Sequence, residues 1–133
     1  MKNKLSVLFV IILALTVVLT ACGGGGGGST DDTASAGEKL FNQTVIGAQA
    51  GCVTCHSLDA GVVIVGPSMD GVGGRAGNTV SGMSAEDYLE ESILNPEAYL
   101  VEGFPSGTMP QVWEDELSNE QVDQLIAFMA TLK

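Results

Sequence analysis

Apolar residues recur at helical intervals in three stretches of this 133-residue chain, and each stretch predicts a helix. The first helix is expected over about 34–44, with Gly37, Leu40 and Phe41 on one face. Little of the remaining sequence alternates strictly between apolar and polar residues, which is the pattern that predicts a half-buried strand. The hydrophobic pattern therefore favours an all-α domain.

The two later helices carry start and stop signals. The second begins after Ser84, a preferred N-cap residue, has Glu86 and Asp87 in its first turn, and ends at Asn95-Pro96. The third begins after Ser118, where Ser-Asn-Glu-Gln forms a capping-box pattern with Gln at the third helical position. Its apolar stripe consists of Val122, Leu125, Ile126, Met129 and Leu132.

The segment between the first two helices is rich in glycine and has weak secondary-structure signals. Within it, the apolar run 62–65 fits a short strand and a buried extended loop equally well. A domain of roughly a hundred residues with three helices and few aromatic residues has a thin core for the chain entropy that folding must offset. We therefore expect a large apolar cofactor to fill its centre.

Residues 1–21 have the parts of an export signal. Lys2 and Lys4 form a positive start, the run 5–20 is mostly apolar, and small residues precede Cys22. The alternative is a transmembrane helix, but about 16 apolar residues are fewer than the roughly 20 that span a bilayer. The pattern favours a signal peptide that is removed on export.

The residues Leu-Thr-Ala-Cys at positions 19–22 resemble the bacterial lipobox, in which the cysteine is acylated and becomes the first residue of the mature protein. The resemblance implies a lipid on Cys22, which would anchor an exported protein to the outer face of the cytoplasmic membrane. A free or disulfide-bonded thiol is the alternative. Residues 22–35 contain six consecutive glycines and then small polar residues, so we expect a flexible tether there and a folded domain over 36–133.

The chain is strongly acidic, with sixteen acidic and five basic residues and a formal net charge of −11. All of the acidic residues follow Cys22, whereas Lys2 and Lys4 would leave with the signal, so the mature chain is more acidic still. This charge disfavours binding to nucleic acid and to anionic lipid headgroups. It favours a protein partner with a basic docking patch; the alternative, that the charge serves only solubility, fits equally well.

The sequence Cys52-Val53-Thr54-Cys55-His56 contains the only histidine of the chain. It is the C-x-x-C-H pattern to which c-type haem is attached, and we expect one covalent haem c on Cys52 and Cys55. This spacing lets two thiols reach the two vinyl groups of one porphyrin while the adjacent imidazole binds the iron. A thioredoxin-like dithiol does not need the histidine, a zinc site needs a fourth ligand, and a simple disulfide explains neither.

Residues 35–133 resemble a small monohaem cytochrome c of class I. The likeness rests on CVTCH, on VGPSMDGVGGRAG at 65–77, on NPEAYLVEGFPSGTMP at 95–110 and on the closing amphipathic helix. It implies an all-α fold in which three to four helices wrap around one covalently bound haem. The segment VIGAQAG lengthens the family's usual connection before the haem motif and is expected to be an inserted loop. The first and last helices would cross, with Gly37 and Phe41 against Leu125, Phe128 and Met129.

The second axial ligand cannot be a histidine, because His56 is the only one. Methionine is then the natural candidate, and His/Met ligation is common among such cytochromes. Met109 lies in a long loop that ends Gly-Thr-Met-Pro, where Pro110 stiffens the backbone, and Met83 remains the alternative. The resemblance implies Met109, because the family's ligand methionine occupies this Met-Pro position.

The resemblance implies further contacts with the haem. The carbonyl of Pro67 would accept a hydrogen bond from His56 and so tune the iron, although an ordinary loop proline is the alternative. Arg75, in a Gly-Arg-x-Gly motif, would pair with a haem propionate, with a plain surface position as the alternative. The residues expected to pack around the haem edge, where Trp and Tyr can also donate to a propionate, are Tyr99, Phe104 and Trp113.

With both axial positions filled by protein, the remaining chemistry is outer-sphere transfer of one electron, so we expect an electron carrier and not an enzyme. The expected setting is a membrane-bound respiratory or photosynthetic electron-transport chain. The stretch ILNPEAYLVEGFPSGTMP is similar to cytochrome c domains fused to haem-copper oxidase subunits, and this similarity supports the respiratory setting. One alternative is a fixed subunit of a quinol-oxidising complex, such as alternative complex III, or of a terminal oxidase. Another is a haem sensor or peroxidase, which the lack of a second histidine as distal base disfavours.

Overall fold

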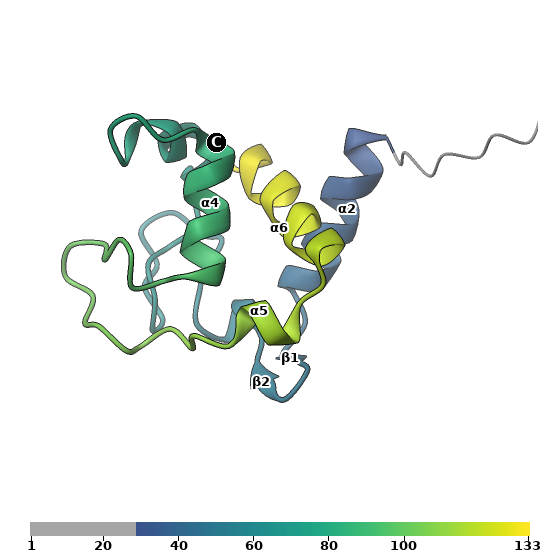
Figure 1. Cartoon of the computed structure of the whole chain (residues 1–133), viewed down its shortest axis with the longest axis horizontal. Helices are drawn as coiled ribbons and strands as arrows, with labels where there is room; N and C mark the ends of the chain where they lie inside the picture. Colours follow the sequence, from purple (N-terminus) through teal and green to yellow (C-terminus); the bar gives the residue numbers. More distant parts are fainter. Residues whose placement is uncertain (1–28) are drawn as a thin grey trace, which may run out of the picture.

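Helices dominate the regular structure of the domain (Figure 1). The computed structural model describes residues 29–133, so the predicted signal segment, Cys22 and the run of glycines lie outside the described residues. The prediction of an all-α domain with three principal helices is confirmed. The helices in this part of the chain are α2 (Thr30–Phe41), α3 (Val72–Arg75), α4 (Ala85–Leu94), α5 (Trp113–Glu116) and α6 (Asn119–Thr131), and one small sheet pairs β1 (Val45–Ile46) with β2 (Gln49–Ala50).

The first helix lies nearer to the N-terminus than the apolar pattern predicted. We expected about 34–44, whereas α2 spans Thr30–Phe41. Ser29 caps the helix, because its side chain accepts a hydrogen bond from the backbone N–H of Asp32 at 3.2 Å. Asp31 and Asp32 in the first turn suit the positive end of the helix dipole. The tether boundary at residue 35 was therefore wrong, because residues 30–35 belong to the helix.

The boundaries of α4 and α6 confirm the predictions made from their caps. The Ser84 side chain accepts from the backbone N–H of Asp87, and α4 ends at Leu94 with Asn95 as its C-cap. In the capping box of α6, Ser118 Oγ accepts from the Gln121 N–H at 3.2 Å, and Gln121 Oε1 accepts from the Ser118 N–H at 2.9 Å. These local hydrogen bonds satisfy donors that would otherwise lack partners at the helix start.

The crossing of α2 and α6 confirms the expected packing of the first and last helices (Figure 1). The aromatic rings of Phe41 and Phe128 lie with their centroids 5.5 Å apart at an interplanar angle of 55°. Leu125 and Met129 are 2% and 5% exposed on the same side of α6. This contact forms one end of a single core that also includes the apolar face of α4.

The segment expected to be an inserted loop forms the β1–β2 hairpin. Ile46 pairs with Gln49 across the turn and is itself buried in the core. The backbone N–H of Ala48 donates to Glu116 Oε2 of α5 at 3.3 Å. The insertion is therefore folded against α5 and connects it to the chain that leads into the haem motif.

The apolar run 62–65 forms neither a regular strand nor a buried loop. Its only strand-like feature in the described structure is an isolated bridge between Val63 and His56. All four residues of the run are more than 40% exposed. Both structures considered for this run were therefore wrong, because its backbone is fixed by hydrogen bonds while its side chains face solvent.

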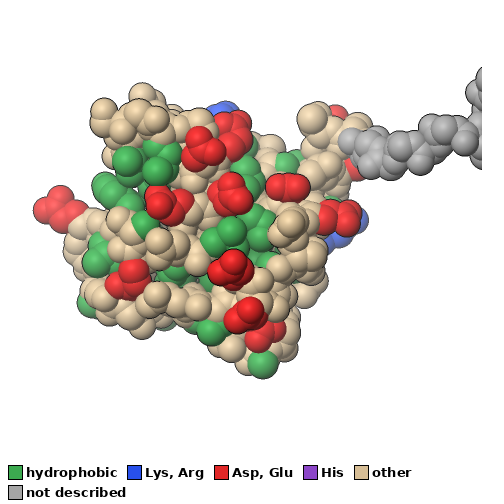
Figure 2. All heavy atoms as spheres, viewed as in Figure 1, with side chains coloured by type: hydrophobic (Ala, Val, Ile, Leu, Met, Phe, Trp, Pro, Cys, Tyr) green, Lys and Arg blue, Asp and Glu red, His purple; other side chains and the backbone are tan. Residues whose placement is uncertain are grey.

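The surface of the domain is acidic on the side that Figure 2 shows. Asp and Glu side chains are scattered over the face that carries α4, α5 and α6, and Lys and Arg appear only at its edge. Between residues 29 and 133, the helices are all too short or too polar to cross a membrane. The basic groups of this part of the chain are Lys39, Arg75 and Lys133.

Candidate functional site

A cavity of about 280 Å³ lies between the helices and the two long loops. Its wall is predominantly apolar and includes Phe41 of α2, Leu89 of α4 and Met129 of α6. The predicted site residues that also line it are Cys52, Cys55, His56, Pro67, Arg75, Tyr99, Phe104, Met109 and Trp113. The fold thus brings together at one cavity residues that are spread over much of the sequence.

A tight turn presents the C-x-x-C-H residues to the cavity. The backbone carbonyl of Cys52 accepts hydrogen bonds from the N–H groups of Cys55 at 3.1 Å and His56 at 2.9 Å. The hydroxyl of Thr54 donates to the carbonyl of Gly51 at 2.6 Å and closes the start of the turn. A turn of 3-10 helix over Cys52–Thr54 leads directly into Cys55 and His56, and both cysteines and the histidine line the cavity.

The two cysteines are free thiols in the described structure and form no disulfide with each other. Burial raises the pKa of the Cys52 thiol, an effect only partly opposed by a backbone hydrogen bond. A raised pKa keeps this thiol neutral at physiological pH, in contrast to the low-pKa thiolates of redox-active dithiols.

His56 is held by the contact that the family resemblance implied. Its Nδ1 lies 2.8 Å from the carbonyl oxygen of Pro67. Because a carbonyl can only accept, Nδ1 carries the proton and the lone pair of Nε2 is left for a metal. Gly66 makes this approach possible, since a Cβ there would lie 2.4 Å from His56 Cε1.

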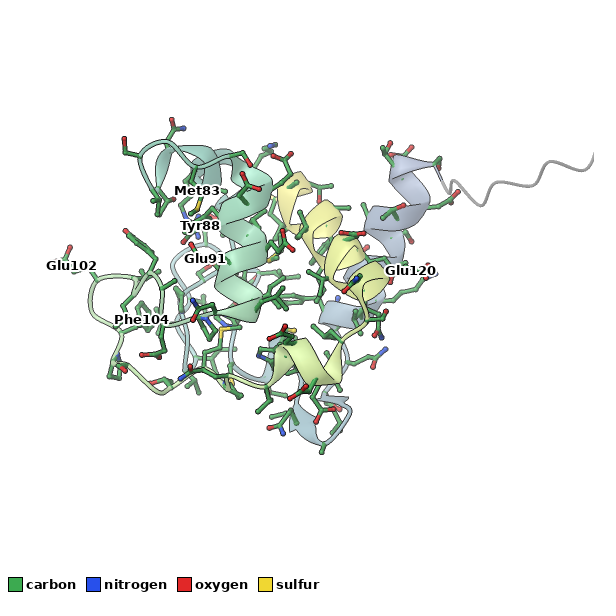
Figure 3. The ribbon with its side chains drawn as sticks, in the orientation of Figure 1. Met83, Tyr88, Glu91, Glu102, Phe104 and Glu120 are labelled. Atoms are coloured by element: carbon green, nitrogen blue, oxygen red, sulfur yellow. The ribbon has the colours of Figure 1, made fainter. Side chains whose placement is uncertain are left out.

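The methionines separate into cavity and non-cavity residues. Met69, Met109 and Met129 line the cavity, whereas Met83 does not. Met83 lies in the loop that precedes α4 (Figure 3). Met129 is 5% exposed and belongs to the hydrophobic core, so we assign it a packing role. Of the two methionines that the sequence left open as ligands, the geometry favours Met109 over Met83 as a side chain available to a group in the cavity.

Glu97 anchors the loop that carries Met109, a role that sequence reasoning missed. The backbone N–H of Gly107 donates to Glu97 Oε1 at 2.7 Å, and the Ser106 hydroxyl donates to Oε2. These two donors lower the pKa of the Glu97 carboxyl, with Ser106 as the larger cause. Ser106 and Gly107 lie nine and ten residues after Glu97 in a loop without periodicity, so the sequence contains no signal that pairs them.

Trp113 brings an unpartnered donor to the cavity wall. It is 4% exposed, and its indole Nε1 is a buried donor without a hydrogen-bond partner in the described structure. A buried N–H without a partner is costly, so the site is completed by an acceptor such as a carboxylate of a bound group. The two thiols, the oriented imidazole and this donor fit a haem, which has vinyl, iron and propionate groups to match them.

The other predicted contacts lie at the rim of the cavity. Tyr99 packs edge-on against Tyr88 of α4, with ring centroids 5.9 Å apart and an interplanar angle of 74°. Phe104 lies on the same loop and is half-buried (Figure 3). Arg75 donates to the carbonyl of Ser68 at 2.9 Å and also to the carbonyl of Asp70. Its guanidinium therefore fixes the glycine-rich loop, and its pairing with a propionate stays a prediction.

Comparison with known proteins agrees with this geometry. The profile of the cytochrome c family matches residues 34–133. Cytochrome c2 iso-2 of Magnetospirillum molischianum is 32% identical over 88 residues, which cover 62% of this chain and 91% of that protein. Cytochrome c2 of Pararhodospirillum photometricum is 29% identical over 118 residues, covering 75% of this chain and 97% of that protein. Cytochrome c2 iso-1 of M. molischianum is 30% identical over 112 residues, with 75% and 100% covered.

The matched region includes the haem motif, the Met109 loop and all helices from α3 onward. Its start at residue 34 lies inside α2, so the family domain and the described fold coincide closely. Since the family binds haem through the same motif, the cofactor is one haem c, attached through Cys52 and Cys55. The chain therefore belongs to the cytochrome c family, as a class I c-type cytochrome that carries electrons and is not an enzyme.

Proposed function

We propose that this protein transfers single electrons through a haem whose iron is held by His56 and Met109. The observation that carries the proposal is that both side chains line the cavity that also holds the two attachment thiols. His56 is oriented by Pro67, with the Nε2 lone pair left free. Met109 comes from a loop anchored at Glu97, and a thioether is the softer ligand expected opposite histidine.

The haem supplies one-electron chemistry, and the residues of the chain set the conditions for it. The carbonyl of Pro67 keeps the proton on His56 Nδ1 and raises the basicity of the ring. The apolar wall formed by residues such as Leu89 and Leu125 keeps water away. Low polarity disfavours additional charge, so this wall favours the reduced iron, as does the thioether of Met109.

Ligation by Met109 is tested by opening the coordination position. In the wild-type holoprotein, we expect the ferrous haem not to bind carbon monoxide at neutral pH. Met109→Ala should bind it readily, and Met83→Ala, the matched control from outside the cavity, should behave as wild type. Carbon monoxide binding by Met83→Ala alone would assign the ligand to Met83. Binding by the wild type would favour a sensor or a peroxidase.

We further propose that the protein works outside the cytoplasmic membrane, held by a lipid on Cys22. The support is the lipobox-like Leu-Thr-Ala-Cys sequence and the run of glycines that follows it. The test is to express the wild type and Cys22→Ser and to separate membranes from soluble fractions by centrifugation. Wild-type haem should sediment with the membranes, and a soluble wild type would contradict the anchor. Cys22→Ser should lose lipid attachment, read by mass spectrometry.

The redox partner in this proposal carries a basic docking patch. The support is the net charge of −11 and the spread of carboxylates in Figure 2. Electron transfer to the partner should then slow as salt is added, because salt screens the attraction. A flat salt response would indicate that the charge serves solubility or that the partner is permanently bound. A haem-stained native gel of membranes solubilised in mild detergent separates a mobile carrier from a subunit of a large complex.

A further inference from the structure

The short helix α5 carries the buried tryptophan of the cavity wall but has little stability of its own. It consists of four residues, and its N-cap, Val112, provides no side-chain hydrogen bond. A single helical turn costs more entropy to form than its backbone hydrogen bonds return, so contacts with other elements must hold it. Trp113 and Leu117, which are 4% and 7% exposed, bury one face of this turn. Glu116 makes a further contact from the same turn.

Glu116 ties α5 to the β1–β2 hairpin, which lies beside it (Figure 1). Its Oε2 accepts a hydrogen bond from the backbone N–H of Ala48 at 3.3 Å. The carboxylate also rests against Gly47, where a Cβ would overlap Oε2. Gly47 has a φ of +58° in the hairpin turn, so glycine suits both the turn and the contact. A carboxylate is a stronger acceptor for a backbone N–H than a neutral group, which favours this contact.

The hairpin is a firm support for this contact, because it is held at both ends. Ile46 is 4% exposed in the core, and the N–H of Gly51 donates to the carbonyl of Thr44 at 2.9 Å, which closes the base of the hairpin. Only Gly51 separates β2 from Cys52, to which the haem is attached. A contact with the hairpin is therefore a contact with the part of the chain that holds the haem.

We propose that Glu116 is a positioning residue that keeps the indole N–H of Trp113 directed at the haem and so helps to set the reduction potential. Trp113 precedes Glu116 by three residues, in the same helical turn. Its Nε1 is buried without a partner in the described structure and suits a carboxylate of the bound haem. Release of Glu116 frees one end of α5, so the indole is held less firmly. This inference rests on the proposed function, since it adds a residue that tunes the same one-electron centre.

The neighbours of Glu116 on α5 show what distinguishes it. Glu114 and Asp115 are also acidic and lie in the same turn, but both are exposed. Among the described residues, neither side chain has a hydrogen-bond partner, whereas Glu116 has the N–H of Ala48. Substitution of Asp115 therefore removes an equal charge from the same helix and leaves the contact with the hairpin intact. Asp115 provides the matched control.

The experiment uses the reduced holoprotein, and the probe is Trp113 itself. The chain contains one tryptophan, so a diamagnetic reduced protein gives one indole N–H resonance in NMR spectra. Exchange of this proton with deuterium is compared with exchange of the backbone N–H of Leu125, which lies in the middle of α6 and reports opening of the core. The variants are Glu116→Ala, Glu116→Gln and Asp115→Ala. Potentiometric titration gives the reduction potential of each.

We expect Glu116→Ala to speed exchange of the indole proton by roughly tenfold relative to that of Leu125, as for the loss of a hydrogen bond. Its reduction potential should lie below that of Asp115→Ala, which loses the same charge, because a less neutralised propionate favours the oxidised iron. Glu116→Gln keeps an acceptor oxygen for the Ala48 N–H, so it should exchange slowly and match the potential of Asp115→Ala. Asp115→Ala should exchange as wild type does.

Either of two results in Glu116→Ala would overturn the proposal: indole exchange at the wild-type rate, or a potential equal to that of Asp115→Ala. Packing of Trp113 and Leu117 would then be sufficient to hold α5. Equal acceleration of indole and Leu125 exchange would also overturn it, because Glu116 would then serve the stability of the whole domain. Failure of the proposed function is recognised separately, by carbon monoxide binding to the wild type or by the lack of a reversible one-electron titration.

Discussion

Gly37 of α2 lies so close to Gln124 of α6 that a Cβ on Gly37 would sit 1.8 Å from the Gln124 carbonyl oxygen. The Cβ of Phe128 would be 2.9 Å away from the same added atom. Both obstacles belong to the helix backbone or lie next to it, so neither can rotate aside. The close crossing of the two helices therefore depends on the absence of a side chain at Gly37.

Gly37→Ala should destabilise the folded protein by about 3 kcal/mol or more, because α2 and α6 must move apart to admit the methyl group. The free energy of unfolding of the holoprotein, measured in guanidinium chloride, checks this. Gly74→Ala is the matched control, since a Cβ there meets nothing within 4 Å, and it should be neutral or slightly stabilising. Equal effects of the two substitutions would contradict the close crossing.

Gly66→Ala should disturb His56 directly. The added Cβ would lie 2.4 Å from His56 Cε1, so the ring must shift and its hydrogen bond to the Pro67 carbonyl must weaken. A weaker hydrogen bond makes the imidazole a poorer donor to the iron and should raise the reduction potential. Potentiometric titration measures this shift. Gly77→Ala, where the nearest atom is 3.6 Å away, should leave the potential unchanged.

Glu97 should make the stability of the Met109 loop depend on pH. Its donors lower the pKa of the carboxyl from the ordinary 4.5, so the folded state binds the proton less tightly than the unfolded chain. The stabilisation that the ionised Glu97 carboxylate gives the folded state is then complete above the ordinary pKa of the carboxyl. This stabilisation is lost as the pH falls through the lower pKa of Glu97 in the folded state. The thermal midpoint of Glu97→Gln should lie below wild type at neutral pH and approach it in acid.

Glu102→Gln is the control for the Glu97 experiment, because Glu102 lies on the same loop and projects away from it (Figure 3). Its thermal midpoint should follow that of the wild type at every pH. A gap between Glu97→Gln and wild type that is the same at neutral and acid pH would show that charge is not the cause.

Trp113→Phe should expose the role of the unpartnered indole N–H. Phenylalanine keeps an aromatic ring in the wall but removes the donor that suits a propionate. Without the donor, the negative charge of the propionate is less neutralised, so the oxidised iron is favoured and the reduction potential should fall. The pH at which the potential begins to vary should also shift. A role in packing alone would lower the thermal midpoint and leave that pH unchanged.

The sequence predicted those parts of the fold that depend on neighbouring residues. Ser84 and Ser118 cap their helices through partners three positions away, so their boundaries could be read directly. Ser29 and Asp32 form a capping pattern of the same kind, but the small polar composition around them suggested a tether instead. A search for Ser-x-x-Asp would have found the start of α2.

The haem attachment residues were predictable for the same reason, because Cys52, Cys55 and His56 act through their spacing. Contacts between residues that are far apart in the sequence could not be predicted. The Ala48 N–H finds the Glu116 carboxylate 68 residues away, and the unpartnered indole of Trp113 becomes visible only once its surroundings are known. The exposed valines at 62–65 show the same limit, since an apolar run does not reveal whether the protein or a partner covers it.

The α2–α6 crossing also has a consequence for how the haem enters. Phe41 and Met129 come from the first and last helices, and both line the cavity. The wall is therefore incomplete until the C-terminal end of the chain docks against its N-terminal helix. The attachment cysteines precede that final helix in the sequence. Until the last helix docks, the cavity is therefore open on the side that Met129 covers.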